Sequence, residues 1–271
     1  MGPFTLTALA SQKKSEVTEV ALSGGAKAQK FEVRAYDYST NHYFIDQIYA
    51  DRNLNIFNNY FSNPTPFIRD SVRVKDIEVW KSTTGLFNPN ERKVNAYIDL
   101  PRKLGTAPYS AQLRDSTVQT DPGTVVGNSR FILLNEGVYY TINKETGFIS
   151  FITSIQEQDA VAIAVRVEGR TGADADDVYY GEFIKDLNLT QETRLVLKLI
   201  KPANLQPQHK KAWKLQLRNI YPIGGRNVKE EGFIFDVMYR VEGQEPQNNY
   251  QGIKLLETFG LDRTDKSKTS T

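Results

Sequence analysis

The sequence predicts a mainly β fold, in which tandem antiparallel β-sandwich-like lobes are accompanied by one amphipathic helix near the N-terminus. Two observations support this prediction. Residues 195–243 contain three segments in which apolar and polar side chains alternate, as they do along strands with one buried face. Residues 131–167 contain four short apolar runs at even spacing, a pattern that is typical of a β-sandwich.

The three alternating segments are separated by residues that end strands. Pro202 and Pro207 lie between the first and second segments, and Gly224 and Gly225 lie between the second and third. We therefore expect three antiparallel strands that share one buried face. The apolar residues expected on that face are Leu195, Leu197, Leu199, Trp213, Leu215, Leu217, Tyr221, Phe233, Phe235, Val237, Tyr239 and Val241.

An amphipathic helix is expected at about residues 40–60, because apolar residues recur there at helical spacing and no proline interrupts them before Pro64. Its apolar face is expected to pack on a sheet, and a docking surface for a partner is the alternative. The apolar face consists of Phe44, Ile45, Ile48, Tyr49, Ile56, Phe57 and Tyr60.

The remaining segments divide into strands and one long loop. Residues 101–127 are polar and have no clear period, so we expect a loop of the kind that is often functional or disordered. A hairpin turn is expected at residues 143–147, where Gly147 is free to adopt a positive φ. Further strands are expected at residues 71–80, 93–100, 131–134, 139–142, 148–152 and 161–167.

These elements predict three parts along the chain. Residues 1–70 form an N-terminal segment that carries the helix, and residues 71–168 form a β-sandwich-like lobe. Residues 169–271 form a second β lobe with a short C-terminal helix. Both ends of the chain resemble cuts from a longer protein, and the start lacks the basic region and apolar core of a secretory signal.

Composition argues against several classes of function. The net charge is +2 and the basic residues are scattered, so we expect no nucleic-acid partner. The chain has no cysteine, which excludes disulfide and thiol chemistry. No apolar run approaches the roughly 20 residues of a membrane-spanning helix. Aromatic residues make up 11% of the chain and can supply a core.

The sequence contains no pattern that points to catalysis or a cofactor. The two histidines, His42 and His209, lie far apart in the sequence, and there is no nucleophile elbow, phosphate-binding loop or dinucleotide fingerprint. We therefore expect no enzyme activity, no catalytic residues and no cofactor.

One acidic stretch is a weak candidate for a cation site. Asp174, Asp176 and Asp177 supply the hard oxygen ligands that Ca²⁺ prefers. The EF-hand spacing fails, because Tyr179 stands where the glycine belongs and Lys185 where the glutamate belongs. We expect a solvated acidic turn and no metal.

Several segments, in order, resemble the SprA (also called Sov) family, the very large outer-membrane proteins of the type IX secretion system and of gliding motility. Their order and spacing match from about residue 22 to residue 263. The similar segments are Val74–Trp80 (Val-Lys-Asp-Ile-Glu-Val-Trp), Tyr140–Ser150, Tyr180–Phe183 (Tyr-Gly-Glu-Phe), Leu197–Lys201 followed by Trp213–Gly225 and Gly232-Phe233, and Leu255-Leu256 followed by Phe259–Arg263. The chain departs from the family pattern at residues 80–92 and 101–128.

The resemblance implies a structural function rather than an enzymatic one. Members of this family form a giant single-chain barrel through which folded cargo crosses the outer membrane. Large insertions build a cap over its extracellular end, and a piece of this length fits such an insertion. The implied partners are the rest of the translocon barrel, a small outer-membrane barrel protein, a plug protein and secreted cargo proteins. The implied location is the outer membrane or cell surface.

The chain has features of both cap and barrel wall. Residues 213–221 have the length of a membrane strand, with aromatic residues at both ends. The intervening segments are polar, however, and an open set of strands would leave unpaired edges in lipid. We therefore expect an extramembrane cap domain. The alternatives are an independent immunoglobulin-like binding or adhesion module of a bacterial cell-surface protein and, in a third class, a hydrolase.

Overall fold

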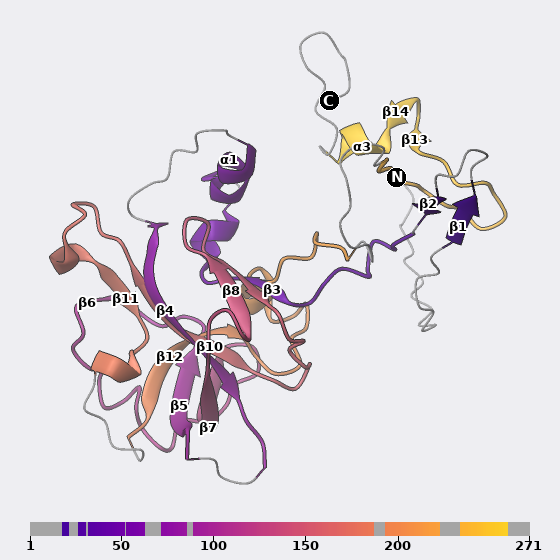
Figure 1. Ribbon diagram of the computed structural model, residues 1–271. Helices are drawn as coiled ribbons and strands as arrows, with labels where there is room; N and C mark the ends of the chain where they lie inside the picture. Colours follow the sequence, from indigo (N-terminus) through magenta and orange to yellow (C-terminus); the bar gives the residue numbers. More distant parts are fainter. Residues whose placement is uncertain are drawn as a thin grey trace. The chain divides into compact units, whose positions relative to one another are not determined.

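The computed structural model describes residues 18–21, 27–30, 32–51, 53–62, 72–85, 89–186, 193–222 and 234–259. These residues are mainly β, as the sequence predicts, with short helices between several sheets (Figure 1). The chain divides into two compact units, residues 1–222 and residues 223–271. No helix among the described residues combines the length and the hydropathy needed to cross a membrane.

The first unit is built around a closed five-stranded sheet. Its strands pair in the order β12–β5–β7–β4–β10, and β10 pairs back to β12 to close the ring (Figure 1). β12 runs parallel to β5, whereas the other pairings in the ring are antiparallel. The five strands are β4 (Val74–Ser82), β5 (Glu91–Tyr97), β7 (Val125–Leu134), β10 (Val161–Val167) and β12 (Leu195–Lys201).

Three smaller sheets and two further strands complete the β structure. β11 (Val178–Tyr180) and β6 (Lys103–Leu104) extend the ring outward from β10. The other strands pair with one another as three separate sheets. They are β1 (Thr18–Ala21) with β2 (Lys27–Lys30), β3 (His42–Phe44) with β9 (Phe148–Phe151) and β8 (Tyr140–Asn143), and β13 (Asn249–Tyr250) with β14 (Ile253–Lys254).

The interior of the first unit is filled by apolar side chains from both the ring and the β3–β9–β8 sheet. Trp80, Phe131, Ile163 and Leu197 are fully buried within one continuous cluster. The strand that closes the ring, β12, is buried at all seven positions. Both faces of β12 are therefore covered by protein, which explains why its apolar run is nearly continuous.

The hairpin turn expected at residues 143–147 is confirmed. The Asn143 side-chain oxygen accepts hydrogen bonds from the backbone N–H groups of Glu145 and Thr146, at 3.1 and 3.0 Å. Gly147 has a φ of +58°, and a Cβ there would lie 2.6 Å from the Tyr49 ring. The turn thus needs glycine for its conformation and for its contact with Tyr49.

The prediction of one helix over residues 40–60 is wrong. This stretch contains β3, the 3₁₀ turn η1 (Gln47–Ala50) and the short helix α1 (Ile56–Ser62). The side chains of Asp46 and Asp51 accept backbone hydrogen bonds from Ile48 and Asn53, at 3.0 and 2.8 Å, and such local bonds compete with a continuous helix. Among the apolar residues of the expected face, Tyr49 and Ile45 are buried and Ile48 is exposed.

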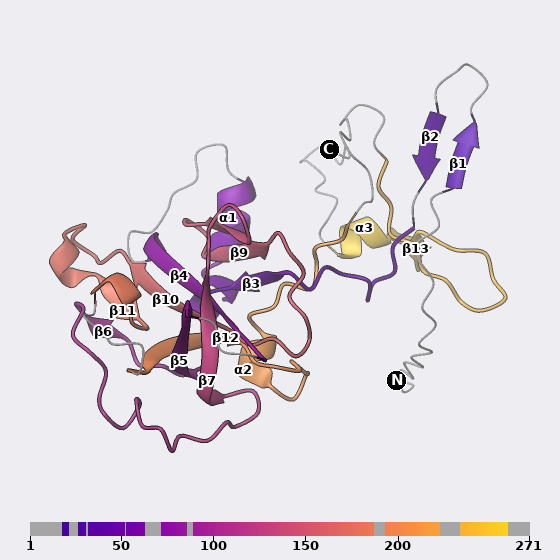
Figure 2. The same ribbon diagram turned by 60° about the horizontal axis from the view of Figure 1, so that its bottom comes forward.

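The prediction of a strand at residues 213–221 is also wrong, and of its four expected buried side chains Leu215 and Leu217 are buried, Trp213 is half-buried and Tyr221 is exposed. Trp213 ends the helix α2 (Lys210–Trp213), which packs beside β12 (Figure 2). The following chain runs along β3, with Phe44 N–H bonded to the Leu215 carbonyl at 2.8 Å and Leu217 N–H bonded to the His42 carbonyl at 3.0 Å. Leu215 and Leu217 are buried as predicted, but this pairing is too short to make a ladder strand.

The third expected strand falls in the second unit and is not formed in the described residues. Phe233 lies outside them, and residues 234–241 make a single β-bridge, from Tyr239 to Gln247. Phe235, Tyr239 and Val241 are exposed rather than buried. The alternation has no ladder partner there, since the described regular elements of this unit are β13, β14 and the helix α3 (Leu255–Thr258).

The boundary expected between residues 168 and 169 lies inside the seven-stranded sheet. β10 ends just before it, while β11 and β12, which follow it, both pair with β10. Residues 195–201 therefore share one core with residues 74–167. Alternation along one strand cannot reveal which distant strand it will pair with.

Candidate functional site

The acidic stretch forms an ion-pair cluster in the structure. Asp177 is fully buried and accepts hydrogen bonds from Lys75 Nζ at 3.0 Å, Arg166 Nε at 2.6 Å and the backbone N–H of Gly169 at 3.0 Å. Asp174 is exposed and lies 3.2 Å from Lys75 Nζ and 2.6 Å from an Arg166 guanidinium nitrogen. Two protein cations therefore lie where a metal ion would be expected.

The electrostatics of Asp177 fit a structural ion pair. Burial opposes ionisation, but the Gly169 N–H bond and the bonds from Lys75 and Arg166 outweigh it, so the pKa of Asp177 is lowered. Asp176 bonds the local turn instead, where its Oδ2 accepts the Thr171 N–H at 2.9 Å. Within the described ranges, no group of three or more His, Cys, Asp or Glu side chains is arranged to hold a metal.

The sequence predicts one long loop at residues 101–127, but its ends form β6 and the start of β7, so the loop itself is residues 105–124. A second buried carboxylate, Glu182, holds this loop. It accepts hydrogen bonds from the backbone N–H groups of Tyr109 and Val196, both at 2.8 Å, and from the Arg114 guanidinium at 2.5 Å. The Asn95 side chain donates to the Leu113 carbonyl at 3.0 Å. The loop runs around the outside of the closed sheet (Figure 2) and is fixed to β5 and β12 by these bonds.

Two lysines interrupt the apolar run of β12, and both are buried. Lys201 donates to the backbone carbonyls of Gln156, Glu157, Asp159 and Pro202, at 2.5–3.4 Å. Burial lowers the pKa of Lys201 to about 8. This lysine joins the end of β12 to the turn that precedes β10.

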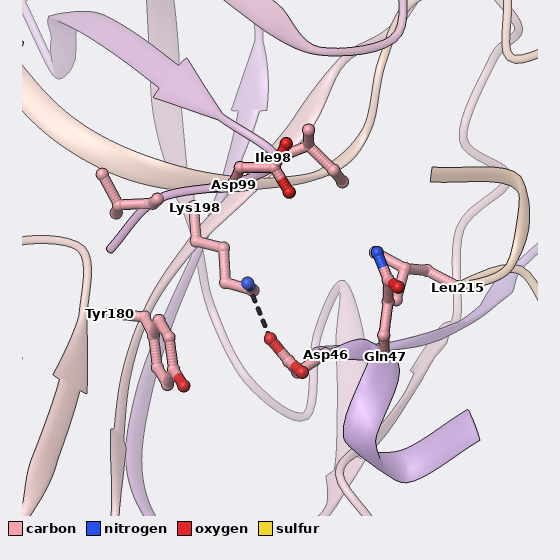
Figure 3. A pocket seen from close by; sticks show the side chains of 8 residues that line it. Asp46, Gln47, Ile98, Asp99, Tyr180, Lys198 and Leu215 are labelled. Carbon is pink, nitrogen blue, oxygen red and sulfur yellow. Dashed lines mark ion pairs between the residues drawn. The ribbon is translucent and has the colours of Figure 1, made fainter. Parts of the chain in front are cut away.

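The other lysine, Lys198, points into a cavity beside β12. Its ammonium lies 2.7 Å from Asp46 Oδ2 and 4.8 Å from the centre of the Tyr180 ring (Figure 3). Asp46 is held in turn at the start of η1, where its Oδ1 accepts the Ile48 N–H at 3.0 Å. A lysine that is 5% exposed carries a large desolvation cost, and this pair offsets it.

The cavity has a volume of about 340 Å³ and is the strongest candidate site in the described chain. Side chains from five segments meet there: η1, β11, β12, the residues after β5 and the residues after α2 (Figure 3). At one side Asp99 pairs with Lys211 at 2.6 Å, and both are exposed. A smaller cavity of about 90 Å³ adjoins it and shares Asp46, Tyr180 and Lys198.

Sequence reasoning missed this cavity. A signal was present, because Lys198 breaks the apolar run from Leu195 to Ile200, and a charge on a doubly buried strand needs a partner. The partner, Asp46, lies about 150 residues earlier in the chain, within the stretch that was expected to be a helix. The two histidines are not part of the cavity lining: His42 bonds Ser150 Oγ at 3.0 Å, and His209 Nδ1 accepts the Gln206 N–H at 3.2 Å.

Comparison of the chain with models of known protein families and with curated proteins finds no match. The class of this protein is therefore defined by its fold and its candidate site. This is a mainly β protein whose first unit is a closed five-stranded sheet, with a polar cavity beside the closing strand.

Proposed function

We propose that this chain is a non-enzymatic structural domain of a SprA-like outer-membrane translocon of the type IX secretion system, and that it forms part of the extracellular cap. The resemblance carries the family assignment, because its segments occur in order along most of the chain. In this role the domain shapes the outer mouth of the conduit. Its partners are the translocon barrel, the small outer-membrane barrel protein, the plug protein and the cargo.

The observation that supports cap over barrel wall is the burial of β12. A membrane strand has one face toward lipid, whereas all seven residues of β12 are covered by protein. Leu215 and Leu217, from the segment with the length of a membrane strand, face the same protein core. The apolar side chains of β12, together with Leu215 and Leu217, thus pack inside the protein.

Labelling of single cysteines on intact cells tests this proposal, because the chain has no cysteine of its own. Ser116→Cys places a thiol on the exposed part of the long loop, and Ala162→Cys places one in the core as the matched control. In the bacterium that encodes the chain, a membrane-impermeant maleimide should label Ser116→Cys on intact cells. It should label Ala162→Cys only after denaturation.

Purification of the labelled protein then tests the assembly. The proposal expects the Ser116→Cys protein to copurify with the small outer-membrane barrel protein and with secreted cargo. Labelling of Ser116→Cys only after the outer membrane is permeabilised would argue against an extracellular cap. Surface labelling without any translocon component, together with saturable glycan binding, would favour an independent adhesion module.

A further inference from the structure

The Lys198 ammonium has hydrogen-bonding capacity that its protein partners do not use. An ammonium carries three N–H donors. The described residues give Lys198 one carboxylate partner, Asp46, and one ring contact, with Tyr180. The remaining donors face the cavity, which also contains the side-chain amide of Gln47 and the carboxylate of Asp99 (Figure 3).

The lining offers donors and acceptors side by side without a strong excess of either charge. Lys198 is matched by Asp46, and Asp99 is matched by Lys211 at the cavity edge. Ile98, Leu100 and Leu215 add apolar surface. The volume of about 340 Å³ lies at the lower end of the roughly 300–1,000 Å³ that is usual for ligand cavities, so the occupant is small.

From this arrangement we infer that the cavity binds a small neutral polyol of pyranose-sugar type. A hydroxyl group is both donor and acceptor, so one hydroxyl can accept from Lys198 and donate to Asp46 without breaking their ion pair. A second hydroxyl can exchange hydrogen bonds with the Gln47 amide, which both donates and accepts, or it can donate to the Asp99 carboxylate. A free sugar and the terminal residue of a glycan chain present the same chemistry.

The same geometry rejects small anions. A carboxylate that accepted a hydrogen bond from Lys198 would lie near the negative charges of Asp46 and Asp99, and this repulsion opposes its binding. A simple hydrophobic ligand would cover Lys198 and Asp46 without offering either a hydrogen bond, which is costly for charged groups. The preference is therefore for hydroxyl groups over charge and over apolar surface.

Two-dimensional amide NMR of the full 271-residue chain tests the inference. Glucose, galactose and mannose are titrated separately, with acetate and inorganic phosphate as anionic probes. A sugar should bind saturably with a dissociation constant on the order of 1–10 mM, as expected for a small polar ligand. The largest shifts should lie at the amides of Gln47, Leu100 and Leu215. The anions should leave these signals unchanged.

Variants of the ion pair then test the role of each side chain. Asp46→Asn keeps a good capping residue for η1 and an oxygen that can accept from Lys198, but it removes the carboxylate. This variant should bind the sugar at least tenfold more weakly, as should Lys198→Met. Asp174→Asn, in a different ion-pair cluster, should bind as the wild type does.

The outcomes distinguish the two sources of the ligand and the failure of the inference. Tighter binding of a trisaccharide than of its methyl glycoside unit would identify a glycan chain end, and equal binding would identify a free sugar. The inference is overturned if no sugar saturates the shifts, if acetate or phosphate binds instead, or if the shifts map elsewhere. The positions of the shifted amide signals in the wild-type protein decide between these outcomes even if Lys198→Met fails to fold.

Discussion

Charged side chains are buried at five positions in the described part of the chain, and each has compensating partners. Glu91 pairs with Arg130, Glu182 with Arg114, Asp177 with Lys75 and Arg166, and Lys198 with Asp46, whereas Lys201 is surrounded by backbone carbonyls. Sequence reasoning could identify some of these residues as unusual but not their partners. Asp177 shows this most clearly, because the acidic stretch was visible while its cation partners were not predicted: Lys75 lies 102 residues earlier and Arg166 lies 11 residues earlier, on the preceding strand of the ring.

Calcium should have no effect on the stability of the wild-type protein through the Asp174–Asp177 stretch. Lys75 and Arg166 neutralise Asp177, so a metal ion would have to displace two protein cations. Thermal unfolding in calcium chloride and in EDTA should give melting temperatures within about 1 °C of each other. A ligand that binds neither the folded nor the unfolded protein does not change the unfolding equilibrium. A rise of several degrees in calcium, lost in Asp177→Asn, would contradict the ion-pair interpretation.

Stability should increase with pH between about 8 and 10.5 because of Lys201. Its pKa is lowered from 10.5 to about 8 in the folded protein by burial, so the folded state releases this proton first as pH rises. The charged form costs stability below pH 8, and that cost, at most about 3 kcal/mol, disappears toward pH 10.5.

Urea unfolding of wild type and Lys201→Met at pH 7, 8, 9 and 10 measures this effect. The methionine side chain is similar in length to lysine and cannot titrate. Tyrosines also titrate at alkaline pH, but they are present in both proteins, so the difference between the two proteins reports on Lys201. The free energy of unfolding of the wild type should rise relative to that of the variant across this range. A difference that stays constant with pH would mean that the buried ammonium is fully compensated by its carbonyl partners.

At the scale of elements, alternation along residues 195–243 was a partial guide, since only the first of the three segments forms a ladder strand in the described residues. Residues 195–201 form the expected strand, and Leu215 and Leu217 are buried as expected, but the latter lie in a segment that follows a helix. At residues 40–60 the helical period was present, yet the aspartates at 46 and 51 cap local turns instead. Local hydrogen bonds and distant pairing partners determined the secondary structure of these segments, and neither can be read from the spacing of apolar residues alone.

The long loop should detach from the sheet when its buried anchor is changed. Glu182→Gln leaves Arg114 without its carboxylate and places an amide NH2 against one of the two backbone N–H groups that Glu182 accepts, Tyr109 or Val196. We expect a loss of about 3 kcal/mol in the free energy of unfolding. Limited proteolysis should cut residues 105–120 faster than in the wild type.

The exposed substitution Glu136→Gln is the control for this change. It removes the same charge from the surface and should alter neither urea unfolding nor the rate of cleavage in the loop. Equal cleavage of Glu182→Gln and wild type would show that Asn95 and the remaining contacts hold the loop without the carboxylate.

At the scale of the whole molecule, the mainly β class followed from the sequence, while the closure of the sheet did not. Closure requires β12 to pair with β5 and β10, which lie on the far side of an expected domain boundary. Once closed, the ring buries the faces of strands from residues 74 to 201 in one core. The candidate cavity exists because this closure brings Lys198 to Asp46, so it could be found only after the topology was known.

The central claim is that the first unit folds around its own core, without lipid. Size-exclusion chromatography with light scattering, performed on the 271-residue chain in the absence of detergent, tests it most directly. The structure predicts a monodisperse species with a β-type circular dichroism spectrum and cooperative unfolding. Aggregation that only detergent reverses would mean that the apolar faces belong in a membrane, and it would contradict both the internal core and the cap assignment.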